Sequence, residues 1–369
     1  MLNKIQSIKS YLNQKYFERE EIIDALFVGL VAKQHTLLIG APGTAKSALV
    51  MDFSKQISGT KYFQWLLTRF STPEELFGPV SLEHLEKGVY KRNVADKLPE
   101  ADLCFLDEIF KSNSAILNSL LTLINERLFY NNGTPIPTPL HSVIGGSSEY
   151  PEEGEGLEAL FDRFLLRFEL DYIGEDQNFL AMLQNDSAYI TEPDKLDLAE
   201  ITQLQEFAAM VNIPDDVLKT LMLIRTDLRD EGIRPSDRRF RQSLSLIKAN
   251  AALNARNTAI LSDILILKNG LWEEVSQKEK TIEVVEYHAA DRCGTELARI
   301  EKVAKEVYAA VQSNPSTELG MEASTKLKQS LTDLGSLLQR YPERQTDIDN
   351  AKSKIMSAQN KIGEALLGI

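Results

Sequence analysis

The sequence predicts an α/β fold in which a parallel sheet covered by helices on both faces precedes an all-α lid and a helical bundle. Short apolar runs alternate with helical patterns up to about residue 175, helical spacing alone continues to 272, and heptad-like spacing fills 273–369. Strands that alternate with helices form a parallel sheet, because each crossover helix packs on one of its faces. We therefore expect three domains with these boundaries.

The N-terminal elements are two helices within 4–33 and a first strand at 35–39, because apolar residues recur at helical spacing and then run continuously. A helix to about residue 58 and a strand at 61–68 follow. Thr72 suits an N-cap and Pro73 a first helical position, so this pair predicts the start of another helix.

Two β-hairpins are expected to be inserted among these elements. The first spans 78–99, with strands at 80–85 and 89–94, and the second spans 127–140 around the turn 131–133. The remaining elements of the first domain are strands at 103–108, 142–145 and 164–170 and helices at 114–126 and 157–163.

The lid and the tail are predicted to be entirely helical. The lid helices are expected at 198–210, 214–229, 237–253 and 262–271. In the tail, apolar residues step by three and four through three runs separated by Pro315 and Pro342, which predicts an antiparallel three-helix bundle or a long hairpin. This tail can serve as a stabilising bundle or as a docking arm for a partner.

A phosphate-binding loop follows the first strand and opens a helix, which is the context that such a loop requires. The residues assigned to it are Gly40, Ala41, Pro42, Gly43, Thr44, Ala45, Lys46, Ser47 and Ala48. Glycines let successive backbone N–H groups converge on phosphate oxygens, and the helix N-terminus adds a partial positive charge. Lys46 can reach the outer phosphates, and the Ser47 hydroxyl can ligate Mg²⁺.

One residue of this loop departs from the general pattern. Ala45 stands before the lysine, where glycine is usual. Alanine adopts helical backbone angles readily, so we expect the loop to be kept, provided that this residue needs no positive φ.

A pair of carboxylates ends a second apolar strand, 61 positions after Lys46. Ligand sites lie at the carboxyl ends of parallel strands, so Asp107 is expected beside the phosphates, where it can hold the water shell of the metal. Glu108 is then placed to orient and deprotonate the attacking water. The sequence therefore predicts nucleotide hydrolysis with ATP and Mg²⁺.

Composition narrows the possible partners and compartments. The net charge is −13, with no concentrated basic run, so we expect no nucleic-acid partner. No run approaches the ~20 apolar residues of a membrane span, and no apolar signal follows Met1. Two cysteines provide no disulfide framework, so the expected location is cytoplasmic.

These motifs together resemble AAA+ ATPases of the MoxR family, and most closely the RavA-like subgroup, over residues 15–272. The matching segments are 40–47, 68–79, 105–109, 124–127, 157–164 and 236–239. The resemblance implies a homo-hexameric ring that remodels a protein partner, which in this family usually carries a von Willebrand factor A domain. It also implies that both hairpins face the central pore.

The resemblance further implies roles for single residues. Arg163 matches the arginine finger that is supplied to the nucleotide of a neighbouring subunit, and Arg238 matches the sensor arginine of the lid. Phe17, with Tyr16, lies where the family contacts adenine. Ser148 stands where the subgroup usually has asparagine at the first sensor position, and one hydroxyl offers fewer hydrogen bonds than an amide, which predicts slower or more regulated turnover.

Two alternatives to a remodelling motor stay open. In the first, the chain is a slowly hydrolysing, nucleotide-gated scaffold whose assembly and helical tail control partner binding, which Ser148 favours. In the second, it is a DNA motor; the net charge of −13 argues against this, and salt-dependent DNA binding would test it.

Overall fold

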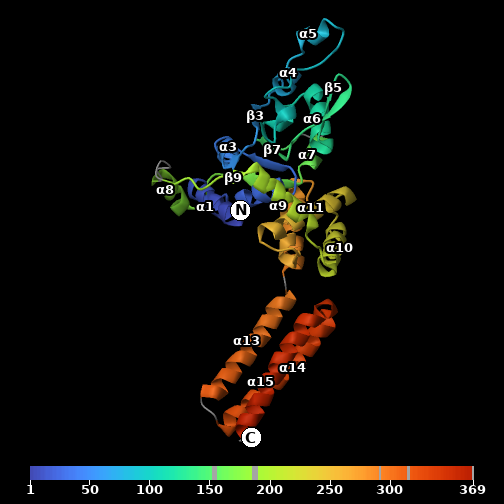
Figure 1. Cartoon of the computed structure of the whole chain (residues 1–369). Helices are drawn as coiled ribbons and strands as arrows, with labels where there is room; N and C mark the ends of the chain where they lie inside the picture. The colour runs from blue at the N-terminus through green and yellow to red at the C-terminus, as the bar shows by residue number, and fades with distance from the viewer. Residues whose placement is uncertain (152–155, 185–189, 291, 314–315, 368–369) are drawn as a thin grey trace. The chain divides into compact units, whose positions relative to one another are not determined.

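The computed structural model describes residues 1–151, 156–184, 190–290, 292–313 and 316–367 (Figure 1). These residues form two compact units, Met1–Ala289 and Ala290–Ile369. The first unit contains a sheet with its covering helices and the lid, and the second contains only helices.

A five-stranded, wholly parallel sheet organises the first unit, in the order β3-β4-β7-β1-β8. Its strands are β3 (Tyr62–Leu66), β4 (Leu103–Asp107), β7 (Ser142–Ser147), β1 (Thr36–Gly40) and β8 (Leu166–Leu170). Because β7 lies between β1 and β4, the segments that follow these three strands emerge together at one edge of the sheet. This order confirms the predicted α/β class and brings the phosphate-binding loop next to Asp107.

Helices cover both faces of the sheet, and side chains alternate between the two. Along β1, Leu38 belongs to one hydrophobic cluster, whereas Leu37 and Ile39 belong to the other. The helices that cover the two faces of the sheet are α1 (Leu2–Lys15), α2 (Glu20–Val31), α3 (Lys46–Lys55), α6 (Ser114–Glu126) and α7 (Glu158–Arg163). The first cluster lies under α1, α2 and α3, and the second lies under α6 and α7.

The first predicted hairpin is only partly present. After α4 (Pro73–Phe77), one antiparallel bridge joins Val80 to Arg92, and the chain then forms the short helix α5 (Leu82–Leu85). The predicted strand at 80–85 is therefore wrong. The Ser81 hydroxyl lies 2.8 Å from Nδ1 of His84, so a local side-chain hydrogen bond stabilises a helical turn where a strand would have little partner to pair with.

The second hairpin is confirmed, with β5 (Leu128–Asn131) paired to β6 (Thr134–Pro137). Asn131 also joins it to the first insertion. Its amide oxygen accepts from the Arg92 backbone N–H at 2.8 Å, and its amide nitrogen donates to the Arg92 carbonyl at 3.0 Å. The two inserted segments are thus linked by one buried side chain.

The lid packs directly on α2 and β8 and shares the first hydrophobic cluster with the core. Its helices are α8 (Asp176–Gln184), α9 (Leu198–Met210), α10 (Asp215–Asp230), α11 (Asp237–Leu253) and α12 (Lys278–Ala289). The helix expected at 262–271 is the 3-10 helix η4 (Leu261–Asn269), and β9 (Leu196–Asp197) pairs with β2 (Ile57–Ser58). Because α12 packs on η4 and α10, residues 273–289 belong to the first unit and not to the tail.

The second unit is a three-helix bundle, one of the two predicted arrangements, built from α13 (Arg292–Ser313), α14 (Thr317–Arg340) and α15 (Gln345–Leu367). Its core contains apolar residues at the predicted spacing, among them Ile300, Leu327, Leu334 and Ile355. The short 3-10 helices of the chain are η1 (Leu98–Glu100), η2 (Ile109–Lys111), η5 (Val275–Gln277) and η6 (Pro342–Arg344). Across the described residues, every helix is too short or too polar to cross a membrane.

Candidate nucleotide-binding and hydrolysis site

The loop between β1 and α3 has the backbone of a phosphate cradle. A Cβ atom at Gly40 would lie 2.1 Å from the Leu170 carbonyl oxygen, so only glycine fits at the end of β1. Gly43 has φ +88°, and Ala45 has φ +67°. The condition under which we expected the loop to be kept, that Ala45 needs no positive φ, is therefore not met, although the loop is present. The turn into α3 requires the left-handed region there, and alanine adopts it at a cost in strain.

Lys46 and Ser47 occupy the first turn of α3 and point to the same edge of the sheet. The Lys46 ammonium group donates to the carbonyls of Gly40 and, at 3.2 Å, Ala41. Burial lowers the pKa of Lys46, while the negative charges of Asp107 and Glu108 oppose that shift. The cation is thus held at the base of the loop, where phosphate oxygens can replace the carbonyls as its partners.

Ser47 and Asp107 supply a pair of oxygen atoms suited to a magnesium ion. The Ser47 hydroxyl donates to Oδ2 of Asp107 at 3.0 Å. Magnesium at nucleotide sites is commonly held by one or two protein oxygens together with phosphate oxygens and water. A Cβ at Gly146 of β7 would lie 2.6 Å from Oδ1 of Asp107, so this glycine makes room for the carboxylate.

Glu108 is fixed by donors from two residues, Ser148 and Lys111, that all approach the same oxygen. Its Oε2 accepts from the Ser148 hydroxyl at 2.9 Å and from the Lys111 ammonium at 3.1 Å. Burial by itself would raise the pKa of this carboxyl. The hydrogen bond and positive charge of Lys111, together with the hydrogen bonds from Ser148, outweigh burial and leave the pKa below its ordinary value. Among the described residues no donor contacts its Oε1, so this oxygen can accept a proton from water.

Lys111 is a residue that the sequence analysis missed. It lies three positions after Glu108, at the end of η2, which brings the two side chains to the same side of a single helical turn. An acidic pair at a strand end followed by lysine at this spacing is the signal that could have identified it.

A pocket of about 350 Å³ opens beside the phosphate-binding loop. It is lined by side chains from the α1–α2 junction, the loop and the segment after β8, namely Lys15, Tyr16, Phe17, Arg19, Gly43, Thr44, Ala45, Tyr172, Ile173, Phe179 and Met182. The Tyr172 hydroxyl donates to the Pro42 carbonyl at 3.2 Å and so ties that wall to the loop. Phe17 therefore lies at a pocket of suitable size and apolar character for a nucleobase.

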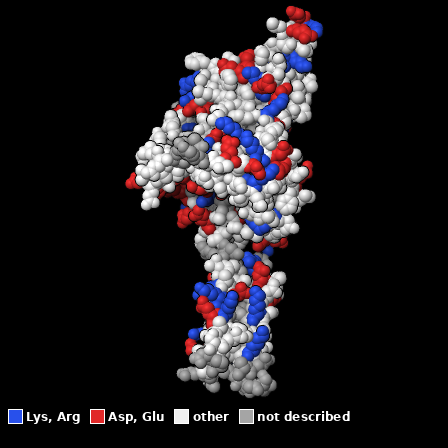
Figure 2. Space-filling view, turned by 60° about the vertical axis from the view of Figure 1, so that its left-hand side comes forward, with Lys and Arg blue, Asp and Glu red and all other residues white. Residues whose placement is uncertain are grey.

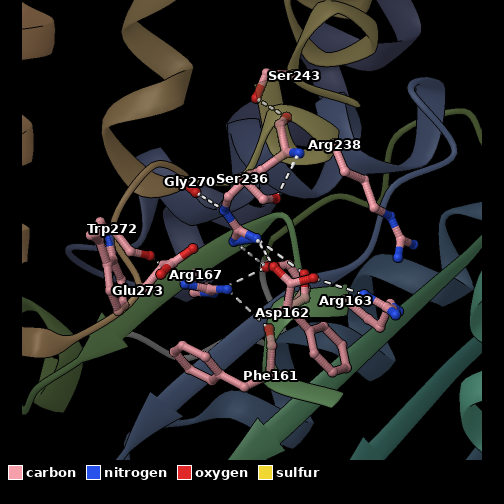
Figure 3. A network of polar contacts seen from close by, with 12 residues as sticks. Phe161, Asp162, Arg163, Arg167, Ser236, Arg238, Ser243, Gly270, Trp272 and Glu273 are labelled. Carbon is pink, nitrogen blue, oxygen red and sulfur yellow. Dashed lines mark hydrogen bonds and ion pairs between the residues drawn. The ribbon is translucent and has the colours of Figure 1, made fainter. Parts of the chain in front are cut away.

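The two arginines singled out by the sequence lie next to each other, away from this pocket. Arg163 ends α7, and Arg238 is in the first turn of α11. In Figure 1, α7 and α11 are on the right of the first unit, whereas α3 and α8 are on the left. The charge of Arg238, after burial, helps to lower the pKa of Arg163. Both side chains lie on the same side of Asp162 (Figure 3).

Each of the two arginines has one polar partner of its own. Arg163 donates to Oδ2 of Asp162 at 2.7 Å, and Arg238 donates to Oδ1 of Asn125 at 3.0 Å. The residues that line the pocket come from segments 15–19, 43–45 and 172–182, and none belongs to α11. The structure therefore places Arg238 beside Arg163 and outside the lining of this pocket.

Comparison with family models identifies two segments. Residues 3–207 match the MoxR domain in the MoxR–vWA–β-propeller ternary systems, and residues 216–285 match an AAA lid domain. The second match extends into α12, in agreement with the packing of this helix on the lid.

Several known proteins are similar to this chain. Two uncharacterized proteins of Methanocaldococcus jannaschii are 38% identical over 276 residues (74% of this chain, 72% of the relative) and 39% identical over 275 residues (73% and 72%). The chaperone MoxR1 of Mycobacterium tuberculosis is 24% identical over 200 residues (52% and 50%). The crystal structure of a presumed ATPase from Cytophaga hutchinsonii has a TM-score of 0.63 at 19% identity, covering 78% of this chain and 93% of that chain, and so shares its fold.

Proposed function

Because this chain belongs to the MoxR family of AAA+ ATPases, we propose that it is a Mg²⁺-dependent ATPase that assembles into a hexameric ring and remodels a protein partner. The observation that carries this proposal is the convergence of Ser47 with Asp107, and of Ser148 with Glu108, beside the phosphate-binding loop. The RavA-like subgroup and the cytoplasmic location stay predictions.

The residues of the site divide the work of hydrolysis among them. Loop N–H groups and Lys46 bind the phosphates, and Ser47 with Asp107 would hold Mg²⁺, which neutralises charge on the phosphate oxygens when bound. Glu108 orients the attacking water through its free Oε1 and accepts its proton. Phe17 and its neighbours bind the adenine ring. This assignment is supported by the positions of all these groups at one edge of the sheet.

The arginines support catalysis between subunits. A pocket on one side of the first unit and two adjacent cations on the other fit a heterologous interface, in which Arg163 reaches the γ-phosphate of the next subunit. The resemblance gives Arg238 the role of the sensor arginine of the lid, without saying which subunit's nucleotide it senses. Its position beside Arg163 supports a role at the neighbouring nucleotide. Repetition of a heterologous contact closes a ring when the rotation between successive subunits completes a full turn.

The inserted segments fit a surface that grips a polypeptide. At the first insertion, Leu82 is 74% exposed and Tyr90 is 53% exposed, and Lys91 follows directly. Exposed apolar and cationic side chains on a projecting segment suit apolar or acidic stretches of a partner. If a chain from which Tyr90 and Lys91 are deleted still remodels its partner, this idea is refuted. The description of the matched domain supports a partner with a von Willebrand factor A domain, within a system that also contains a β-propeller.

A nucleotide-gated scaffold is the second candidate function. Lys111 and Ser148 hold Glu108 without the amide that the subgroup usually has at the first sensor position, which favours slow hydrolysis. A nucleic-acid motor has less support, because acidic and basic side chains are interspersed over the visible face (Figure 2).

The test is ATP turnover per subunit, measured with Mg²⁺ over a wide range of protein concentration, together with native mass. We expect the rate to climb as rings form, and we expect both Glu108→Gln and Arg163→Ala to abolish it. A negligible rate at all concentrations, also with the partner present, would exclude the motor and favour the scaffold. Turnover by a stable monomer would exclude catalysis between subunits.

A further inference from the structure

Two arginines are almost completely buried where the lid meets the core. The side chains of Arg167 in β8 and Arg239 in α11 are each 1% exposed. Burial strongly disfavours a charged guanidinium unless its donors are satisfied, and it lowers the pKa of both groups. Their partners therefore show what these residues contribute.

Arg239 fastens the lid to the segment that carries Arg163. Its Nε donates to the Gly270 carbonyl, and its Nη2 donates to the Phe164 carbonyl at 2.9 Å. Its Nη1 donates to the Asp162 carbonyl at 3.1 Å and approaches Oδ1 of the same residue at 3.3 Å. Four acceptors from two segments thus hold the first turn of α11 against the end of α7.

Arg167 fastens the same junction in a different way. It donates to the carbonyls of Phe161 and Phe164, each at 3.1 Å, and to that of Trp272. Its guanidinium carbon lies 3.8 Å from the centre of the Phe161 ring. These contacts are to backbone carbonyls and an aromatic ring, so Arg167 joins lid and core through groups other than the Asp162 carboxylate.

The Asp162 carboxylate connects Arg239 to Arg163. Its Oδ1 faces Arg239, and its Oδ2 accepts from Nη1 of Arg163 at 2.7 Å. Nε of Arg163 is buried without a hydrogen bond, so the carboxylate is the group that orients this guanidinium. Arg238 precedes Arg239 in the same helical turn and lies on the Arg163 side of Asp162 (Figure 3).

We propose that Arg239 is a positioning residue for Arg163: through Asp162 it fixes the Arg163 guanidinium beside Arg238, so that both cations meet the phosphates of a second copy as one unit. This inference rests on the proposed function of Arg163 between subunits. It assigns Arg239 a role in positioning as well as in folding, since a displacement of about 1 Å can lower a rate on the order of a hundredfold.

Two variants separate this role from simple stability. Asp162→Asn removes the charge between the two arginines at a partly exposed side chain, and Arg239→Lys keeps a buried cation but loses its fork of donors. Arg167→Lys is the matched control, since it weakens the same junction from an equally buried site. Arg241→Lys, at an exposed position of α11, is the control for the helix surface.

We expect Asp162→Asn and Arg239→Lys to lower kcat roughly tenfold to a hundredfold, with the half-saturating ATP concentration little changed, because each variant's own pocket is intact. Arg167→Lys should lower thermal stability at least as much as Arg239→Lys while lowering kcat much less. Arg241→Lys should resemble the original chain.

Mixed rings then show whether a variant impairs its own nucleotide site or the nucleotide site of the neighbouring subunit. Each variant is mixed with an excess of Lys46→Ala subunits, which cannot turn over ATP but carry an intact Arg163, Asp162 and Arg239. Turnover per variant subunit should recover, as it should for Arg163→Ala treated in the same way. Recovery of Arg163→Ala alone would overturn the positioning role and leave the proposed function standing. Failure to restore Arg163→Ala would overturn both, and an unchanged or faster rate in the two unmixed variants would overturn the positioning role.

Discussion

Ala45 is the residue at which the structure makes its most direct prediction about stability. It stands between Thr44 and Lys46 with φ +67° and ψ 19°, and its side chain is exposed. The left-handed region costs an L-residue about 1–2 kcal/mol, chiefly through the Cβ atom. Replacing Ala45 with glycine removes that atom and leaves the backbone of the loop in place.

The expected gain is the strain released minus the extra entropy of the unfolded chain. Glycine in place of alanine adds about 0.4–1 kcal/mol of conformational freedom to the unfolded state. The difference is a net stabilisation of about 0.5–1 kcal/mol, which corresponds to about 1–3 °C in the Tm of a unit of this size.

Tryptophan fluorescence measures this effect selectively. The chain has two tryptophans, Trp65 and Trp272, and both lie in the first unit. Their signal during denaturation therefore reports that unit and not the helical bundle. Ala255→Gly is the matched control, because Ala255 is exposed, has φ +57° and lies far along the chain in the lid.

Both substitutions should raise the unfolding free energy by similar amounts. If Ala255→Gly stabilises the unit but Ala45→Gly destabilises it, then Ala45 does not adopt the left-handed region and the explanation of the loop is wrong. If neither has an effect, the strain assigned to these positions is too large.

Three further predictions concern the site and the core. Lys111→Met should raise the pKa of Glu108 and move the acid limb of kcat to higher pH, whereas Lys111→Arg should not; an unshifted limb in the methionine variant would contradict the contact. Ser148→Asn should raise turnover, and an unchanged rate would show that this position does not limit it. Burial keeps the pKa of His35 low, so the unfolded state binds its proton first as pH falls below about 6.5, and the first unit should lose up to about 1.4 kcal/mol per pH unit there. Denaturation at several pH values should show that slope, and His35→Asn should flatten it.

The elements that the sequence predicted best are those whose pattern is local. The helix at 114–126 has the predicted bounds, and the strand at 103–107 lies where continuous apolar residues placed it. The turn at Asn132 and Gly133 was also correct, because both residues tolerate the positive φ that it requires. Predictions that depended on a distant partner were less accurate, as the helical turn at 82–85 shows.

The same difference between local patterns and distant contacts applies to the candidate site. Residue types and spacing identified Lys46, Ser47, Asp107 and Glu108, since strand, glycine loop and acidic pair are contiguous patterns. Lys111 was missed although its spacing from Glu108 is a usable signal, because the ion pair also depends on Glu108 adopting φ +52°, which the motif alone does not predict.

By itself, the sequence determined that this chain is an α/β protein with a glycine loop between a strand and a helix, a helical lid and a helical tail. These features follow from local periodicity and from short motifs. Only the tertiary structure decided that Ala45 is strained, that α12 belongs to the lid, and that Arg238 lies beside Arg163. Such facts depend on the packing of segments up to hundreds of residues apart. Contacts between distant segments produce no periodic pattern in the sequence, so they cannot be predicted from it alone.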